Sequence, residues 1–171
     1  MAKSSTTPEA SVARTLSDRA GFLLAQLGTH GHKRFAERLE RVDLHPRHFG
    51  TLSHLAGAEG RSQQALSAAL GIHRSATVAL IDDLEARGLA ERRPDPNDRR
   101  AYTLYLTPSG RKVLAELEQA ADEHEDELLA GLEEPEREEL ISLLQRVAES
   151  QGLAAGVHPN LARSRGDGSS E

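Results

Sequence analysis

The chain contains no cysteine and no tryptophan, and its aromatic residues are limited to two tyrosines and three phenylalanines. The lack of cysteine excludes disulfides, thiolate metal sites, catalytic thiols and cysteine-based oxidant sensing. No apolar run approaches the roughly 18 residues of a membrane-spanning helix, and no secretory apolar region follows the polar start. At 171 residues, the expectation is one domain with tails, located in the cytoplasm and without a membrane partner.

The charge of the chain is unevenly distributed. The formal net charge of −6 argues at first against a nucleic-acid partner. Residues 71–112, however, carry eight Arg or Lys against six acids, whereas residues 113–150 carry thirteen acids against two arginines. A basic middle segment can form a phosphate-binding face although the whole chain is acidic.

Apolar residues at helical spacing predict a long first helix that ends before the break at 43–46. Its stripe consists of Leu16, Ala20, Leu23, Leu24, Leu27, Phe35, Leu39 and Val42. Residues 1–14 lack such periodicity and are expected to form a disordered arm. A second helix is predicted from Pro46 to about Ala58.

The middle of the chain has the pattern of a helix-turn-helix followed by a hairpin. Ser62 suits the N-cap of a short helix that Gly71 closes, and another helix follows until Gly88. Residues 89–93 and 101–106 then flank the turn-rich segment PDPNDRR, which predicts two antiparallel strands.

Two further helices are predicted toward the C-terminus. Thr107 and Pro108 suit the N-cap and first position of a helix that runs to about Ala130, and the last helix spans about 135–150. A single helix-turn-helix contacts about half a turn of DNA, and the apolar stripes of the terminal helices exceed what this small core can bury. We therefore expect a two-fold homodimer, with an interface formed by 16–27 and 140–147.

The residues of the helix-turn-helix and wing segments indicate which protein family the chain resembles. The stretch ALSAALGIHRSATVALIDDLEARGLAERRPDPNDRRAYTLYLTPSGR resembles the MarR family of winged helix-turn-helix transcriptional regulators, most specifically in DRRAYTLYLT at 98–107. The resemblance implies a mainly α fold with a small antiparallel β-wing. The resemblance covers a domain at 15–150, and the composition predicts an arm at 1–14 and, from its Gly, Ser, Pro and Arg, a disordered tail at 151–171. Within the domain, dimerisation helices at 15–42 and 108–150 enclose a DNA-binding lobe at 46–107.

The start of the helix after Gly71 is the candidate reader of DNA bases. A recognition helix places polar side chains of its first two turns in the major groove. The candidates here are His73, Arg74, Ser75, Ala76 and Thr77. Arg74 can form two hydrogen bonds to guanine, at O6 and N7, and the Ala76 methyl can pack against a thymine methyl. The alternative is that His73 or Ser75 only caps the helix.

The hairpin is the candidate wing. Arg99 and Arg100 lie at its tip, where a cation can enter the electronegative minor groove. In the family an aspartate at the position of Asp98 usually fixes a wing arginine, so one of the two is expected to be held and the other, with Arg99 favoured, to enter the groove. Arg92 and Arg93 are predicted to contact phosphate.

The resemblance also implies an effector pocket for a small aromatic or carboxylate ligand. Its predicted lining is His30, Arg34, His45, His48 and Phe49. The alternative for His48 and Phe49 is ordinary packing. Members of the family usually repress transcription by binding a palindromic operator, and the resemblance implies the same for this chain.

Other functions have less support in the sequence. A zinc-responsive regulator is an alternative because the chain has eight histidines, but their spacing is poor for one ion, and no metal is expected. A second alternative is a protein-interaction module without DNA binding, against which the arginine-rich wing argues. The sequence shows no arrangement typical of an enzyme, and no cofactor is expected.

Overall fold

The computed structural model describes residues 15–96, 101–153 and 156–157, and the fold is mainly helical with one small sheet. The helices are α1 (Ala20–Glu40), α2 (Pro46–Ala56), α3 (Gln63–Leu70), α4 (Arg74–Ala86), α5 (Pro108–Leu128) and α6 (Glu134–Ser150). The predicted fold class and helix order are confirmed. Leu16 lies outside the first helix, in a short 3-10 turn at Leu16–Asp18 that Thr15 and Asp18 cap.

The sheet has three antiparallel strands rather than the predicted two. Strands β2 (Ala90–Pro94) and β3 (Tyr102–Leu106) form the wing, and the two-residue β1 (Arg61–Ser62) pairs with the other edge of β3. On the central strand β3, Thr103, Leu104 and Leu106 are buried, whereas Tyr102 at its start is exposed. Strand β1 was not predicted, because two residues are too few to show alternation.

The predicted helix caps are present. The Ser62 hydroxyl accepts a hydrogen bond from the Ala65 N–H at 3.2 Å, and Gly71 adopts the left-handed conformation with φ of 64°. Thr107 accepts from the Gly110 N–H at 2.9 Å and donates to the Gly88 carbonyl at 2.6 Å. Thr107 therefore fixes the start of α5 to the turn that leads into the wing.

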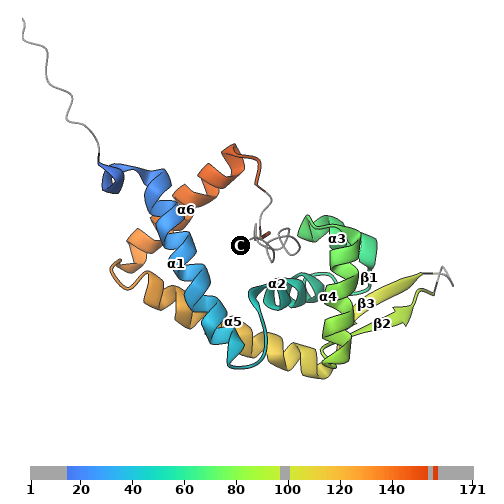
Figure 1. The fold of residues 1–171 in the computed structure, drawn as a ribbon. Coiled ribbons are helices and arrows are strands. Elements are labelled where there is room, and N and C mark those ends of the chain that lie inside the picture. The colour runs from blue at the N-terminus through green and yellow to red at the C-terminus, as the bar shows by residue number, and fades with distance from the viewer. Residues whose placement is uncertain (1–14, 97–100, 154–155, 158–171) are drawn as a thin grey trace, which may run out of the picture.

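Two lobes are connected by α2 and α5. Figure 1 shows α1 and α6 together at one end of the molecule, α3, α4 and the sheet at the other, and α5 running between them. The core consists of leucines and isoleucines from both sides of this connection: Leu39, Leu44, Leu52, Leu55, Leu66, Leu70, Ile72, Leu80, Ile81, Leu84, Leu89, Leu104, Leu106, Leu114 and Leu117. None of the helices in the described ranges is long and apolar enough to cross a membrane.

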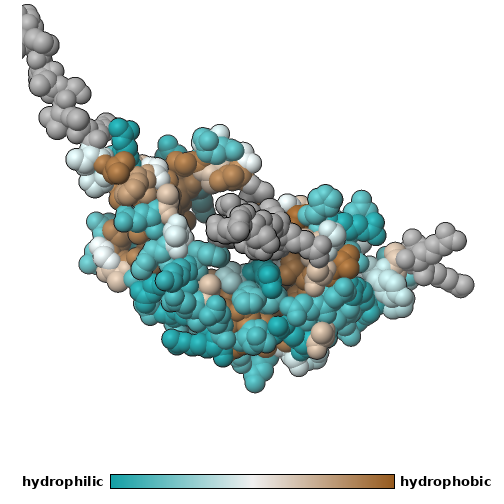
Figure 2. Space-filling model, viewed as in Figure 1, coloured by the Kyte–Doolittle hydropathy of each residue, from teal (hydrophilic) through white to brown (hydrophobic). Residues whose placement is uncertain are grey.

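A large apolar surface remains on α1 and α6. Its exposed residues are Phe22, Leu23, Leu24, Leu27, Ile141, Leu143, Leu144 and Val147. Figure 2 shows apolar side chains gathered over these two helices. Isolated apolar residues on a surface are common, but a group of them on two helices at one end of the molecule indicates an interface.

Candidate nucleic-acid interface and ligand pocket

The N-terminal turn of α4 is an exposed polar edge. His73, Arg74 and Ser75 are exposed, and Ala76 is half-buried. His73 occupies the N-cap position, but its side chain makes no capping hydrogen bond. These side chains are therefore accessible to a ligand that approaches the end of the helix.

Thr77 does not belong to this edge, and its predicted contact with DNA is wrong. Its side chain is fully buried, and its hydroxyl accepts a hydrogen bond from Ser67 Oγ at 2.8 Å. The helical period places Thr77 on the same face as Ile81 and Leu84, which pack into the core. Thr77 thus fastens α4 to α3.

Arg92 connects the wing to α4 instead of projecting from it. Its guanidinium pairs with Asp82 at 2.7 Å and with Glu85, and its backbone N–H donates to Glu85 at 2.7 Å. Only 20% of the side chain is exposed. The predicted phosphate contact is therefore replaced by a structural role, because two carboxylates already neutralise this cation. The sequence prediction missed Asp82 and Glu85, whose spacing of three on one helix is the signal for such a clamp.

Arg93 is the more accessible of the two wing arginines. It pairs with Glu91, its guanidinium carbon lies 4.3 Å from the centre of the Tyr105 ring, and 56% of the side chain is exposed. The phosphate contact predicted for Arg93 stays a prediction. Asp98, Arg99 and Arg100 lie outside the described residues.

A polar cluster joins α2 to the inner side of α4. His48 is fully buried; its Nε2 lies 2.8 Å from Asp83 Oδ2, and its Nδ1 accepts a hydrogen bond from the His45 backbone N–H at 3.1 Å. Burial lowers the pKa of His48 to about 4, although the Asp83 carboxylate acts to raise it. The imidazole is therefore neutral at pH 7, with its proton on the Nε2 that faces Asp83.

Arg87 extends this cluster to the segment between α1 and α2. Its Nε lies 3.0 Å from Asp83, and its Nη1 donates to the side chain and the carbonyl of Asp43 at 2.8 and 2.7 Å. Burial acts to raise the pKa of Asp83, but the hydrogen bond from Arg87 and the nearby charges hold it below its usual value.

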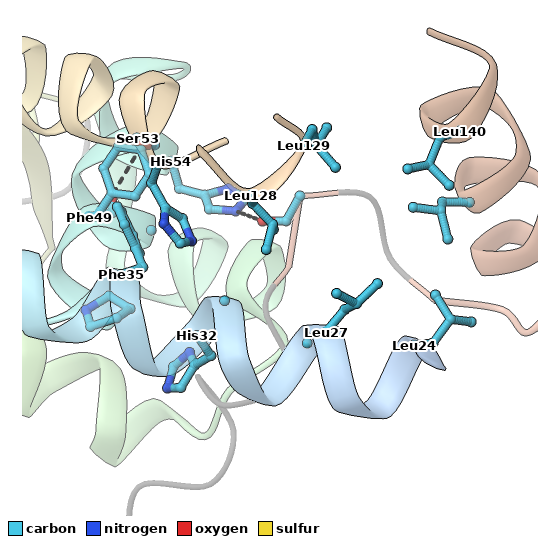
Figure 3. A pocket seen from close by; sticks show the side chains of 17 residues that line it. Leu24, Leu27, His32, Phe35, Phe49, Ser53, His54, Leu128, Leu129 and Leu140 are labelled. Atoms are coloured by element: carbon cyan, nitrogen blue, oxygen red, sulfur yellow. Dashed lines mark hydrogen bonds between the residues drawn. The ribbon is translucent and has the colours of Figure 1, made fainter. Parts of the chain in front are cut away.

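A cavity of about 740 Å³ lies between α1, α2, α5 and α6. Its lining is mostly apolar and consists of Leu24, Leu27, Gly28, Gly31, His32, Phe35, Pro46, Phe49, Gly50, Ser53, His54, His124, Leu128, Leu129, Leu140, Leu144 and Gly156. In Figure 3 the rings of Phe35, Phe49 and His54 gather at one end, whereas Leu24, Leu27 and Leu140 lie at the other. Such a volume and lining are typical of a small-molecule site.

Four of the five residues predicted to line the pocket do not line it. His30 is exposed on α1, and Arg34 pairs with Glu127 at 2.9 Å on the outer side of α1 and α5. His45 is the N-cap of α2, and His48 points toward α4. The prediction failed because residues of one helix that differ by one or two positions face different sides.

Phe49 lines the cavity as predicted and packs edge-on against Phe35, with 5.7 Å between the ring centres. The missed residues include three histidines: His32, His54 and His124. Burial lowers the pKa of His124, and the nearby guanidinium charges of Arg38 and Arg34 lower it further.

The charge of the cavity differs from expectation as well. Within the described parts of the chain, no lysine or arginine lines it, so no other cation takes the place of the predicted Arg34. The same parts contain no group of three His, Cys, Asp or Glu that could hold a metal ion.

Comparisons with known proteins agree on one class of protein. The sequence profile described as MarR family matches residues 42–101. A putative transcriptional regulatory protein for the hcr operon of Thauera aromatica is 34% identical over 134 residues, which cover 78% of this chain and 81% of that protein.

Solved structures show the same fold, and two of them contain DNA. The transcriptional repressor CouR bound to a 23-mer DNA duplex is 36% identical, with a TM-score of 0.70 over 78% of this chain and 94% of that one. A mutant MarR from E. coli complexed with operator DNA is 26% identical, with a TM-score of 0.65 over 74% of this chain and 91% of that one. Each of these similarities extends over both lobes of the fold.

Proposed function

Because this chain belongs to the MarR family of winged helix-turn-helix transcriptional regulators, we propose that it binds a palindromic operator as a homodimer. In this proposal the protein is located in the cytoplasm with the chromosome, and it represses transcription until a small ligand enters its pocket. The observation that carries this proposal is the exposed N-terminal turn of α4, with Arg74 and Ser75 accessible beside the wing. Its family and structural neighbours are regulators rather than enzymes, and we propose no catalytic activity.

Three positions of α4 are proposed to read bases. Arg74 suits bidentate hydrogen bonds to guanine O6 and N7, Ser75 can donate to or accept from a base or phosphate, and the Ala76 methyl suits a thymine methyl. Arg93 is proposed to contact phosphate. For the wing tip, the prediction remains that Asp98 holds one of Arg99 and Arg100 while the other enters the minor groove.

The dimer is proposed from the exposed apolar surface of α1 and α6. Two recognition helices must be held about 34 Å apart to read two half-sites, which requires a second copy of the chain. Leu23, Leu27 and Val147 are exposed on the helices that lie farthest from the wing. An interface there would leave both α4 helices free to face DNA.

The effector is proposed to be an aromatic compound whose polar end is neutral. Phe35, Phe49 and His54 offer a ring-lined end for an aromatic group. A free carboxylate would be buried without a cation beside it, which is costly. The cavity therefore favours a phenol or an ester over the corresponding acid.

The DNA-binding proposal is tested by fluorescence anisotropy with the promoter of the chain's own coding region. We expect Arg74→Ala to reduce the preference for operator over random DNA by about 5- to 150-fold, since a bidentate base contact is worth about 1–3 kcal/mol. Arg93→Ala should weaken both DNAs alike and reduce the salt dependence. Lys33→Ala, an exposed cation on α1 outside the proposed dimer segments, is the matched control and should change neither. Equal operator and random-DNA affinity in the unaltered protein would refute the proposal.

The ligand proposal is tested with a matched pair of compounds in the same assay. Methyl 4-hydroxybenzoate should weaken operator binding at least about fivefold, the lower end of typical allosteric coupling, and 4-hydroxybenzoate should be much less effective. Phe49→Ala should reduce the response without changing operator affinity in the absence of ligand. A stronger response to the acid would contradict the proposed neutral ligand. If neither this pair nor a panel of other aromatic compounds changes the affinity, the protein is not ligand-responsive in the proposed way.

A further inference from the structure

Helix α2 lies between the cavity and the recognition helix and contacts both. Phe49 and Ser53, four residues apart, line the cavity with Gly50 and His54. His48, adjacent to Phe49, points the other way and reaches Asp83 on α4. A displacement of α2 by a molecule in the cavity would therefore act directly on the position of α4.

The contact between α2 and α4 is buried on the His48 side, whereas 37% of the Asp83 side chain is exposed. His48 is fully buried, and both of its ring nitrogens face a partner: the His45 N–H at 3.1 Å and Asp83 Oδ2 at 2.8 Å. Asp83 is also held by Arg87, which reaches Asp43 in the segment between α1 and α2. Because an unpaired buried polar group is costly, a movement of α2 that separated His48 from Asp83 would be opposed unless α4 followed.

The position of Asp83 on α4 allows a small movement at the contact to displace the end of α4 that is proposed to face DNA. Asp83 is nine residues after Arg74, so the two lie about 13 Å apart along the helix. A tilt of a few degrees about the Asp83 end would move Arg74 by about 1 Å, because displacement grows with distance from the pivot. Such a change is comparable to the tolerance of a hydrogen bond to a base edge.

We propose that His48 and Asp83 are positioning residues that transmit occupancy of the cavity from α2 to the recognition helix. The inference rests on the proposed ligand-responsive function, and it identifies the contact through which the response passes. The cluster does not touch the ligand or DNA; it sets the orientation of α4 relative to α2.

The test is a double-mutant cycle in which a side chain replaces the ligand. Ser53→Phe adds a ring to the cavity from α2, and operator affinity is measured by anisotropy with and without Asp83→Asn. We expect Ser53→Phe to change the operator Kd at least about fivefold in the otherwise unaltered protein. In the Asp83→Asn background, the same substitution should change it less than about twofold. His48→Gln provides a second background that should give the same result.

Asp82→Asn is the matched control. It removes the same charge from the neighbouring position of α4, while Arg92 keeps Glu85 as a partner. The full effect of Ser53→Phe should persist in this background. Circular dichroism and gel filtration establish that each variant is folded and has an unchanged oligomeric state. If Ser53→Phe does not fold, saturating methyl 4-hydroxybenzoate replaces it in the cycle.

The outcomes separate the inference from the proposed function. If the cavity substitution changes operator affinity equally in all backgrounds, His48 and Asp83 do not transmit occupancy, and the ligand-responsive function stands. If filling the cavity by substitution and by ligand changes operator affinity in no background, both are refuted.

Discussion

Gly110, near the start of α5, is the position where one added methyl group should do most damage. A Cβ there would overlap with the carbonyl oxygen of Leu89 and would lie 2.8 Å from its carbonyl carbon. Cβ atoms in proteins essentially never come closer than 3.0 Å to such atoms. The Leu89 carbonyl cannot yield easily, because it accepts the Thr107 N–H at 3.1 Å. Gly110→Ala must therefore separate the start of α5 from the turn that leads into the wing.

The expected loss of stability can be estimated from the contacts involved. Weakening the Thr107 backbone bond costs about 1 kcal/mol, losing the Thr107 cap costs about 1 kcal/mol, and the backbone shift of about 1 Å costs about 1–3 kcal/mol. The higher helix propensity of alanine returns about 1 kcal/mol. The net loss is about 2–4 kcal/mol, which lowers the Tm by roughly 5–15 °C for a chain of this size.

The assay is thermal and urea unfolding followed by circular dichroism at one fixed protomer concentration, because the stability of a dimer depends on concentration. Gly131→Ala, between α5 and α6 and outside the proposed dimer segments, is the matched control: a Cβ there meets nothing within 4 Å, so its Tm should stay the same or rise. Operator affinity of Gly110→Ala should also fall, because the wing base moves relative to α4. An unchanged Tm for Gly110→Ala would refute the reasoning, since the close approach of Leu89 would then not exist in solution.

Three other predictions follow from the described contacts. Thr77→Val should destabilise the protein by about 1 kcal/mol in urea unfolding, since the buried hydrogen bond between Ser67 and Thr77 is lost while Ser67 keeps the Gln63 carbonyl as an acceptor. The folded protein should keep its operator affinity; a selective loss of affinity would indicate that Thr77 contacts DNA. Burial lowers the pKa of His48 from 6.5 to about 4, so between these pH values only the unfolded state binds a proton at this residue. The free energy of unfolding should therefore fall by up to about 1.4 kcal/mol per pH unit as the pH drops from 6.5 to 4. His48→Gln should remove that part of the pH dependence, and an identical slope would contradict the buried neutral imidazole. Leu23→Glu combined with Val147→Glu should give monomers in analytical ultracentrifugation and abolish tight binding to the palindrome, because both side chains are exposed and neither lines the cavity. If the double variant still forms dimers, the interface lies elsewhere.

The sequence contained enough local information to predict the elements and their ends. Ser62, Gly71 and Thr107 act through neighbours three or four residues away, so their capping roles follow from sequence order alone. The order of helices and the wing motif were sufficient for the family, which the comparisons show. The exposed position of Arg74 at the start of α4 was likewise predictable from the turn before it.

The roles of several individual side chains depended on residues far away in the sequence. Arg92 was predicted to contact phosphate, but Asp82 and Glu85 neutralise it once β2 packs beside α4. His48 and Phe49 were assigned to one pocket, yet adjacent residues of a helix face different neighbours, and only the packing of α4 on one side and of α1 on the other decided which residue meets the cavity. Spacing along the chain determines which residues share a helix face, but the charge, burial and partners of that face are determined by the element that packs against it.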